Sequence, residues 1–239
     1  MTVTTSPGRP LSPSEFLAEC IDFKAHHLTG GRFLMAMVQG ELTRAQLDLW
    51  AKDMYHFVQP GIPALTAWLA HAPTAVERDS ARLIARNLAG ELGFLREADH
   101  RDLYLKLLRD GFGISEETAR EHLPQPGTIG ATTALCAFCR SSWEEGIGSF
   151  GLALEMQIPG RPNGAAVIYQ ALKRYGIDED ALEFYRIHEE AEEEHGDNAE
   201  RAVAPFIQTR EQQALVRHAF RWTVLALNGM QAGFDRFLS

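Results

Sequence analysis

The chain has 239 residues, 45% of them hydrophobic and 23% charged, with a net charge of −9 and a pI near 5.5. A chain of this length can bury enough surface to fold without disulfides or a structural metal. The net negative charge argues against nucleic-acid binding, because proteins that bind nucleic acids normally carry a basic patch. No apolar run reaches the roughly 18–20 residues that span a bilayer, and the first residues do not resemble a signal peptide. We therefore expect a cytoplasmic protein with neither a nucleic-acid nor a membrane partner.

Helix signals follow one another along the whole chain, and no segment shows the alternating pattern of a strand. Capping boxes begin at Ser12, Thr43 and Thr209, each followed three residues later by Glu or Gln. The expected helices are, in chain order, 13–26, 47–58, 64–70, 73–90, 100–108, 128–158, 165–175, 178–204 and 209–238. This pattern predicts a single all-α domain over residues 1–239, with 1–11 as a disordered tail and with room for metal sites between facing helices.

The three cysteines, Cys20, Cys136 and Cys139, are too few for a disulfide framework. Cys136 and Cys139 form a C-x2-C pair, but they lie in an apolar helical run without a second pair. We expect buried structural thiols, the common state of free cysteine.

The segment from Phe184 to His195 carries a His-x3-Glu-x2-His pattern in a helical stretch that runs without Gly or Pro up to Gly196. Around a helix, Glu192 lies at roughly 40° and His195 at roughly −20° from His188, so the three side chains share a narrow face. Imidazole and carboxylate on a rigid helix are ligands for a transition metal such as iron or manganese. The competing interpretation is an exposed acidic helix that happens to contain two histidines.

Two further stretches contain candidate ligands. Glu155 stands in an otherwise apolar run, where a lone acid is costly to bury unless it is paired or bound to a metal; otherwise it reaches solvent at a helix end. Glu91 and His100 are nine residues apart, so they would face opposite sides of an unbroken helix. They can meet only if the backbone breaks between them, and Gly93 is the expected place. If the helix continues, Glu97 replaces Glu91 as the ligand.

Taken in order, these residues resemble the pattern of the heme-oxygenase-like diiron oxidases and oxygenases, relatives of the TenA and PqqC proteins. The family has a Glu, a His seven to ten residues later, a Glu about fifty-five further on, and a His-x3-Asp/Glu-x2-His motif. The resemblance extends from about Phe33 to the last helix. It implies a heme-oxygenase-like helical bundle in which two iron ions, or manganese, are bound by six ligands: Glu91, His100, Glu155, His188, Glu192 and His195.

This sequence departs from the family pattern or its branches at several positions. Many relatives have Asp where this chain has Glu192, and the longer side chain can change the spacing of the metals. The TenA branch uses a cysteine nucleophile and a Glu in its last helix, whereas residues 214–238 of the last helix here contain no Glu. The members that form p-aminobenzoate sacrifice a Tyr and a Lys, where this chain has Leu34 and Ala165. These differences disfavour both activities.

The resemblance therefore implies an enzyme that uses O2, and electrons from an external donor, to oxidise a small metabolite. The expected chemistry is N-oxygenation, desaturation or oxidative C–C cleavage of an amino-acid or fatty-acid type of substrate. The alternative is a metal-free TenA/PqqC-like protein that binds a small molecule or has a regulatory role. Arg140 and Glu144 would lie near the face of Glu155 on one continuous helix; Glu144 is a candidate pocket acid, while a surface position is favoured for Arg140. The sequence leaves open whether the chain forms a homodimer.

Overall fold

The computed structural model describes residues 9–73, 78–95, 98–156, 158–188 and 203–238. Within these ranges the chain forms helices and no strand, which confirms the all-α prediction. The first half contains α1 (Pro13–His27), α2 (Gly31–Gln39), α3 (Arg44–Val58), α4 (Gly61–Ala70), α5 (Arg78–Glu91), α6 (His100–Lys106) and the π-helix η1 (Leu107–Phe112). The second half contains α7 (Glu116–Glu121), α8 (Pro126–Cys139), α9 (Trp143–Gly146), η2 (Ile147–Glu155), α10 (Gly164–Arg174), η3 (Ala204–Phe206), α12 (Arg210–Phe234) and η4 (Asp235–Leu238). Residues 183–188 are also helical.

The three predicted capping boxes are all present. Ser12, Thr43 and Thr209 each accept a hydrogen bond from the backbone N–H three residues later. The side-chain oxygen of the Glu or Gln at that later position accepts a hydrogen bond from the backbone N–H of the capping residue. Leu11, at the end of the predicted tail, exchanges two hydrogen bonds with the side chain of Gln213. Leu11 is therefore part of the fold rather than of a tail.

The helix predicted over 128–158 is wrong in its continuity, because the chain forms three successive helices there. α8 ends at Cys139, and Ser142 then caps α9 by accepting a hydrogen bond from the backbone of Glu145 at 3.1 Å. The spacing of Ser142 and Glu145 is itself a capping-box signal that the apolar character of the run concealed. The last piece, η2, is a wide π-helix, a form frequent at functional sites.

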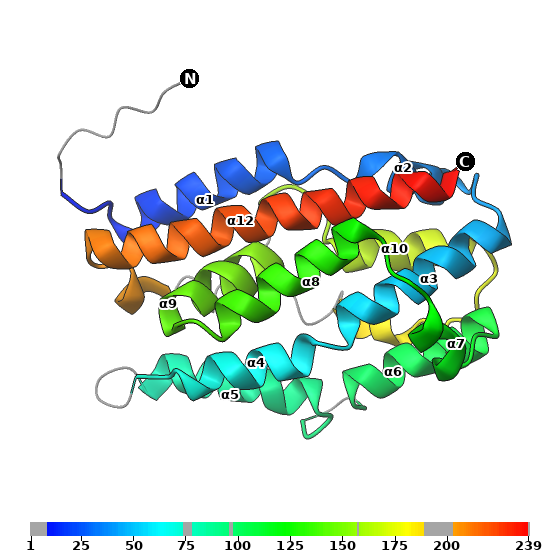
Figure 1. Cartoon of the computed structure of the whole chain (residues 1–239), viewed down its shortest axis with the longest axis horizontal. Coiled ribbons are helices and arrows are strands. Elements are labelled where there is room, and N and C mark those ends of the chain that lie inside the picture. The colour runs from blue at the N-terminus through cyan, green and yellow to red at the C-terminus, as the bar shows by residue number, and fades with distance from the viewer. Residues whose placement is uncertain (1–8, 74–77, 96–97, 157, 189–202, 239) are drawn as a thin grey trace.

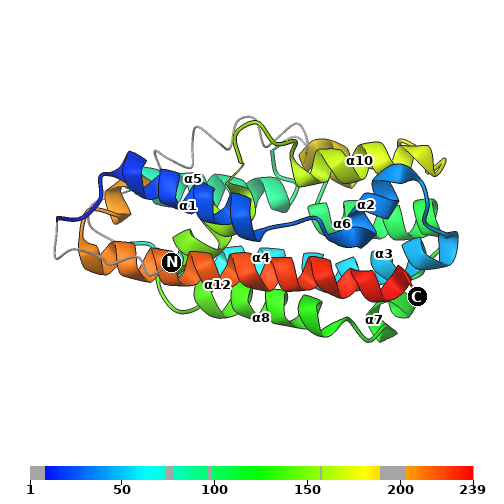
Figure 2. The same cartoon turned by 90° about the horizontal axis from the view of Figure 1, so that it is seen from above.

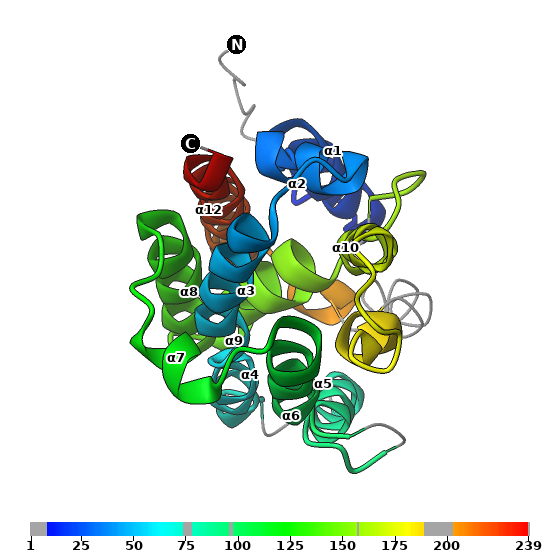
Figure 3. The same cartoon turned by 90° about the vertical axis from the view of Figure 1, so that its right-hand side faces the viewer.

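The helices pack side by side along the long axis of the molecule (Figure 1). Viewed along that axis, α8 and α12 form one outer side, and α5, α10 and α1 lie on other sides (Figure 3). The core divides into two groups of buried residues, one centred on α3, α6 and α10 and the other on α1, α4 and η2. Gly148 of η2 lies so close to the Val216 carbonyl of α12 that a Cβ would collide with it.

The N-terminus of α8 is fixed by a buried acid from another helix. Asp53 of α3 is fully buried, and it accepts hydrogen bonds from the Gln125 backbone N–H at 2.8 Å and from the Thr128 hydroxyl. A carboxylate at this position compensates the unpaired N–H groups and the partial positive charge of the helix end. This contact holds α8 against α3 and so fixes one wall of the bundle.

Candidate metal centre

Glu91 and His100 meet because α5 stops as predicted at Gly93. Gly93 has a left-handed φ of 73°, and its N–H and that of Phe94 bond back to the carbonyls of Gly90 and Ala89. This is a Schellman motif, in which glycine avoids the strain of a left-handed residue. Asp99 then caps α6 through the N–H groups of Arg101 and Asp102.

Glu91 is thus the last residue of α5 and His100 the first of α6. The Nδ1 atom of His100 lies 2.8 Å from Oε2 of Glu91, and their side chains are 12% and 27% exposed. Despite this distance, His100 Nδ1 is buried and makes no hydrogen bond among the described residues. A buried ring nitrogen without a hydrogen bond is costly, and coordination to a metal would satisfy it.

His188 faces this pair from the helical segment 183–188. Its ring centroid lies 4.7 Å from that of His100, and its Nδ1 is 2.6 Å from the Phe184 carbonyl one turn earlier. A proton on Nδ1 shared with this carbonyl leaves the lone pair on Nε2, as is usual for histidines that bind metals. Burial lowers the pKa of His188, an effect that nearby His100 adds to and the Glu91 and Glu155 carboxylates oppose. The neutral imidazole is the form that binds a metal.

One ligand atom from each of Glu91, His100 and His188 lies within 4.8 Å of the other two. Two imidazoles and one carboxylate in a partly buried cluster fit a first-row transition metal, and this ligand set with open positions is typical of non-heme iron oxygenases. The residues present therefore fit the metal that the sequence predicted.

Glu155 lies close to this cluster but is not among the three converging side chains. It is the last residue of η2, and its charge is near enough to raise the pKa of His188. The carbonyl of the next residue, Met156, accepts a hydrogen bond at 2.5 Å from Nζ of the buried Lys24. A cation at the carboxyl end of a helix is favoured by the helix dipole. Lys24 thus fixes the end of the helix that carries Glu155.

The loop after η2 is also tied to His188. Nδ2 of Asn163 donates to the His188 carbonyl at 3.2 Å, while its Oδ1 caps α10 by accepting from the N–H groups of Ala165 and Ala166. Arg161 in the same loop donates to the Ala25 carbonyl of α1 at 3.0 Å. The two helix ends with candidate ligands are therefore held by hydrogen bonds from neighbouring segments.

The other predicted ligands, Glu192 and His195, lie outside the described residues, as does Glu97, the alternative to Glu91. The placement of Glu91 beside His100 supports the choice of Glu91. Lys24 and Asn163 did not emerge from the sequence. A lone Lys in the amphipathic helix α1 would have been the only signal for Lys24, and the Asn–Gly pair at the start of α10 indicates a helix cap but not a link to His188.

The structure also places Arg140 and two of the cysteines, for which the sequence leads to expectations. Arg140 is exposed at the end of α8, and the break between α8 and α9 removes the helical geometry that related Arg140 and Glu144 to Glu155. Cys20 and Cys139 are buried, as predicted for structural thiols, and burial raises the pKa of each thiol to about 12.

The chain matches the model of a family described as iron-containing redox enzymes over residues 48–228. It belongs to that family. Among solved structures, a CADD-like protein of unknown function from Nostoc punctiforme is similar, with a TM-score of 0.76 and 16% identity over 94% of this chain and 97% of that one. A TenA homologue from Pseudomonas syringae has a TM-score of 0.74 and 12% identity over 99% and 97% of the two chains.

A domain with a heme-oxygenase-like fold from Shewanella denitrificans is also similar, with a TM-score of 0.68 and 14% identity over 96% of each chain. These likenesses confirm the heme-oxygenase-like helical fold that the resemblance implied. No curated protein matches the sequence. Among the described helices, none is long and apolar enough to cross a membrane.

Proposed function

We propose that this family member is a non-heme diiron oxidase or oxygenase that uses O2 to oxidise a small metabolite. The observation that carries the proposal is the convergence of Glu91, His100 and His188, which come from three separate segments, on one partly buried point. Helix-borne imidazole and carboxylate groups seldom gather in this way without a metal to neutralise and bind them. The family description, iron-containing redox enzymes, agrees with iron at this point.

In this proposal Glu91, His100 and His188 hold one iron ion, and Glu155 with Glu192 and His195 completes the site for two. When bound, the iron ions supply the activation of O2 for N-oxygenation, desaturation or oxidative C–C cleavage, with electrons from an external donor. The chain's own contribution is to present ligands already in place. The hydrogen bond from His188 to the Phe184 carbonyl fixes the imidazole tautomer. The end of the helix at Gly93 sets the distance between Glu91 and His100.

Buried aromatic rings line one side of this cluster. The ring of Phe184 lies 4.4 Å from that of His188 and 6.4 Å from that of His100, and the ring of Tyr104 lies 5.1 Å from that of Phe184. These rings exclude water from the cluster on that side, which strengthens the interaction between the ligands and a cation. An apolar wall also suits a substrate with a hydrocarbon portion, as expected for an amino-acid or fatty-acid type of metabolite.

The alternative is a metal-free TenA-like protein that binds a small molecule, and the likeness to a TenA homologue favours it at the level of fold. The buried and protonated Cys20 and Cys139 oppose a TenA-like cysteine nucleophile at either position. The metal content of the protein distinguishes the two functions.

Ferrous iron titrated into the protein under anaerobic conditions tests the proposal. We expect tight binding by the unaltered chain. Glu91→Ala and His188→Ala should each lose at least one iron ion per chain, because each removes a side chain that is proposed to bind the metal directly. Glu183→Ala is the matched control, since the Glu183 side chain is 30% exposed, close to the 27% of Glu91, and pairs with Lys106 instead. Equal iron binding by all four proteins would refute the proposed centre.

A further inference from the structure

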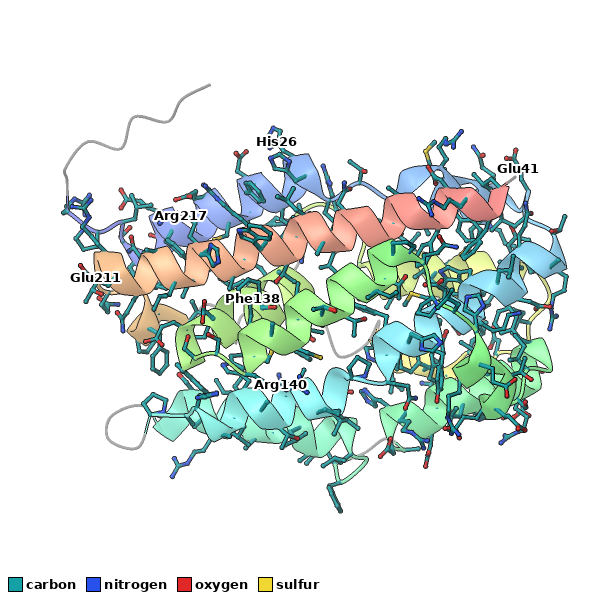
Figure 4. All side chains as sticks on the ribbon, in the orientation of Figure 1. His26, Glu41, Phe138, Arg140, Glu211 and Arg217 are labelled. Carbon is teal, nitrogen blue, oxygen red and sulfur yellow. The ribbon has the colours of Figure 1, made fainter. Side chains whose placement is uncertain are left out.

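The inward side of α1 carries a lysine among apolar residues. The buried residues of this helix include Phe16, Cys20 and Lys24, which follow one another at intervals of four and therefore lie on one side of it. His26, two residues beyond Lys24, has the opposite direction and points outward from the bundle, with its side chain 70% exposed (Figure 4). Lys24 is only 5% exposed. It thus occupies a position where the pattern of the helix favours an apolar side chain.

A buried lysine is rare, because an ammonium group taken out of water is costly unless opposite charge or hydrogen bonds compensate it. Among the described residues, Lys24 is the one lysine or arginine that is buried. The buried acid Asp53 is explained by its contacts with the amino end of α8. Lys24 therefore needs an explanation of its own, and buried ionisable groups gather at functional sites.

Lys24 lies beside a segment that belongs to the candidate metal centre. Its Nζ donates a hydrogen bond at 2.5 Å to the carbonyl of Met156, the residue that follows Glu155. Figures 2 and 3 show α1 between α12 and the segment that leads into α10. Asn163 at the start of α10 donates in turn to the His188 carbonyl. The ammonium group is therefore on the side of the bundle where the candidate ligands gather.

The hydrogen bond to Met156 does not explain why the side chain at this position is charged. The carbonyl accepts one of the three N–H donors of an ammonium group and brings no formal negative charge. A glutamine can donate the same kind of bond without the cost of burying a charge. In the proposed centre Glu155 shares its charge with the metal. A cation beside it is then suited to a further anion that enters the site.

We propose that Lys24 binds the carboxylate of the substrate and thereby orients the molecule at the metal centre. This inference rests on the proposed function, since the molecule that Lys24 holds is the one that the iron centre oxidises. Amino-acid and fatty-acid substrates both carry a carboxylate, and its hydrogen bond with an ammonium group is of the strong, charge-assisted kind. The apolar ring of Phe184 beside His188 suits the hydrocarbon portion of the same molecule.

Binding of octanoate to the iron-loaded chain in the absence of O2 tests this role. The comparison probe is 1-octanol, which has the same length but no charge. In isothermal titration, Lys24→Gln should raise the dissociation constant of octanoate by about tenfold to a hundredfold, the range expected for one hydrogen bond between charged groups. The dissociation constant of 1-octanol should stay the same, because glutamine retains a donor for the Met156 carbonyl.

Lys106→Gln is the matched control for this titration. Lys106 lies on α6, is 23% exposed and pairs with Asp180 and Glu183, so its loss should leave octanoate binding unchanged. If Lys24→Gln binds octanoate like this control, or loses affinity for both probes equally, Lys24 does not bind the carboxylate.

Two further variants keep the inference testable if Lys24→Gln does not fold. Lys24→Met places an apolar side chain in an apolar position, so it should keep the helical circular dichroism and lose the preference for octanoate over 1-octanol. Lys24→Arg keeps the charge and should keep most of that preference. An equal preference in the two variants would overturn the proposed role of the charge.

Titration with leucine distinguishes the two types of substrate, since its ammonium group is repelled by Lys24 and octanoate has none. We expect octanoate to bind more tightly. The iron content of each sample separates this inference from the proposed function. If two iron ions are bound but octanoate binding does not depend on Lys24, this inference alone is wrong. A chain that binds octanoate through Lys24 but retains no iron would support the carboxylate site and contradict the oxidase.

Discussion

His188 shows how one side chain becomes suited to a metal through its surroundings. The Phe184 carbonyl holds one ring nitrogen, burial lowers the pKa of the imidazole, and His100 and Glu91 lie opposite. The sequence alone predicted that His188 faces a metal, because helical spacing is local information. That Glu91 and His100 share a site with His188 was expected only from the family resemblance, because helical spacing does not show how distant segments pack.

Two of the three cysteines, Cys20 and Cys139, are buried. Burial raises the pKa of Cys20 and Cys139 to about 12, so at neutral pH both are protonated, and thiols react only as thiolates. With Ellman's reagent, we expect the native chain to release at most one fast equivalent, from the half-buried Cys136, and three after unfolding in urea. Rapid modification of Cys139 in the native protein would show that this thiol is exposed and ionised, contrary to the structure.

Among the structural elements, the end of α5 and the end of η2 show which parts of a site are encoded locally. The stop at Gly93 was predictable, because glycine at that point has a clear role in a left-handed helix end. The division of 128–158 into α8, α9 and η2 was not predicted, since its apolar residues favour a continuous buried helix and the Ser142 cap is a short signal within them. The position of Glu155 depends on this division.

Asn163 caps α10 with its side-chain oxygen and donates from its side-chain nitrogen to the His188 carbonyl. Asn163→Asp keeps the oxygen that caps α10 but replaces the donor to the His188 carbonyl with a negative charge. We expect unchanged thermal stability and a metal affinity reduced by about tenfold, the usual minimum effect of groups that orient metal ligands. Isothermal titration with ferrous iron and a thermal melt measure the two quantities.

Asn228→Asp serves as the control for that experiment. Its side-chain oxygen accepts from the Thr29 backbone and hydroxyl, contacts that an aspartate retains, and it lies on α12 rather than at the metal centre. If Asn163→Asp binds iron like this control, the hydrogen bond to His188 does not position the ligand.

For the whole molecule, the all-α class, the order of most helices and the heme-oxygenase-like fold were predictable from the capping boxes, the glycine and proline breaks and the family resemblance. The short helix α7 was missed although Ser115 caps it, because six residues give a weak periodic signal. Features that arise only from packing could not be predicted, including the contact between Lys24 and Met156.

We propose that this bundle holds two iron ions between its helices, and the iron content of the purified protein shows whether it does. After anaerobic reconstitution with ferrous iron and removal of loosely bound metal, elemental analysis should find close to two iron ions per chain, and exposure to O2 should oxidise them. Without a bound metal the cluster of Glu91, His100 and His188 would need another explanation. A chain that retains no iron after this treatment would contradict the account and favour a metal-free binding protein.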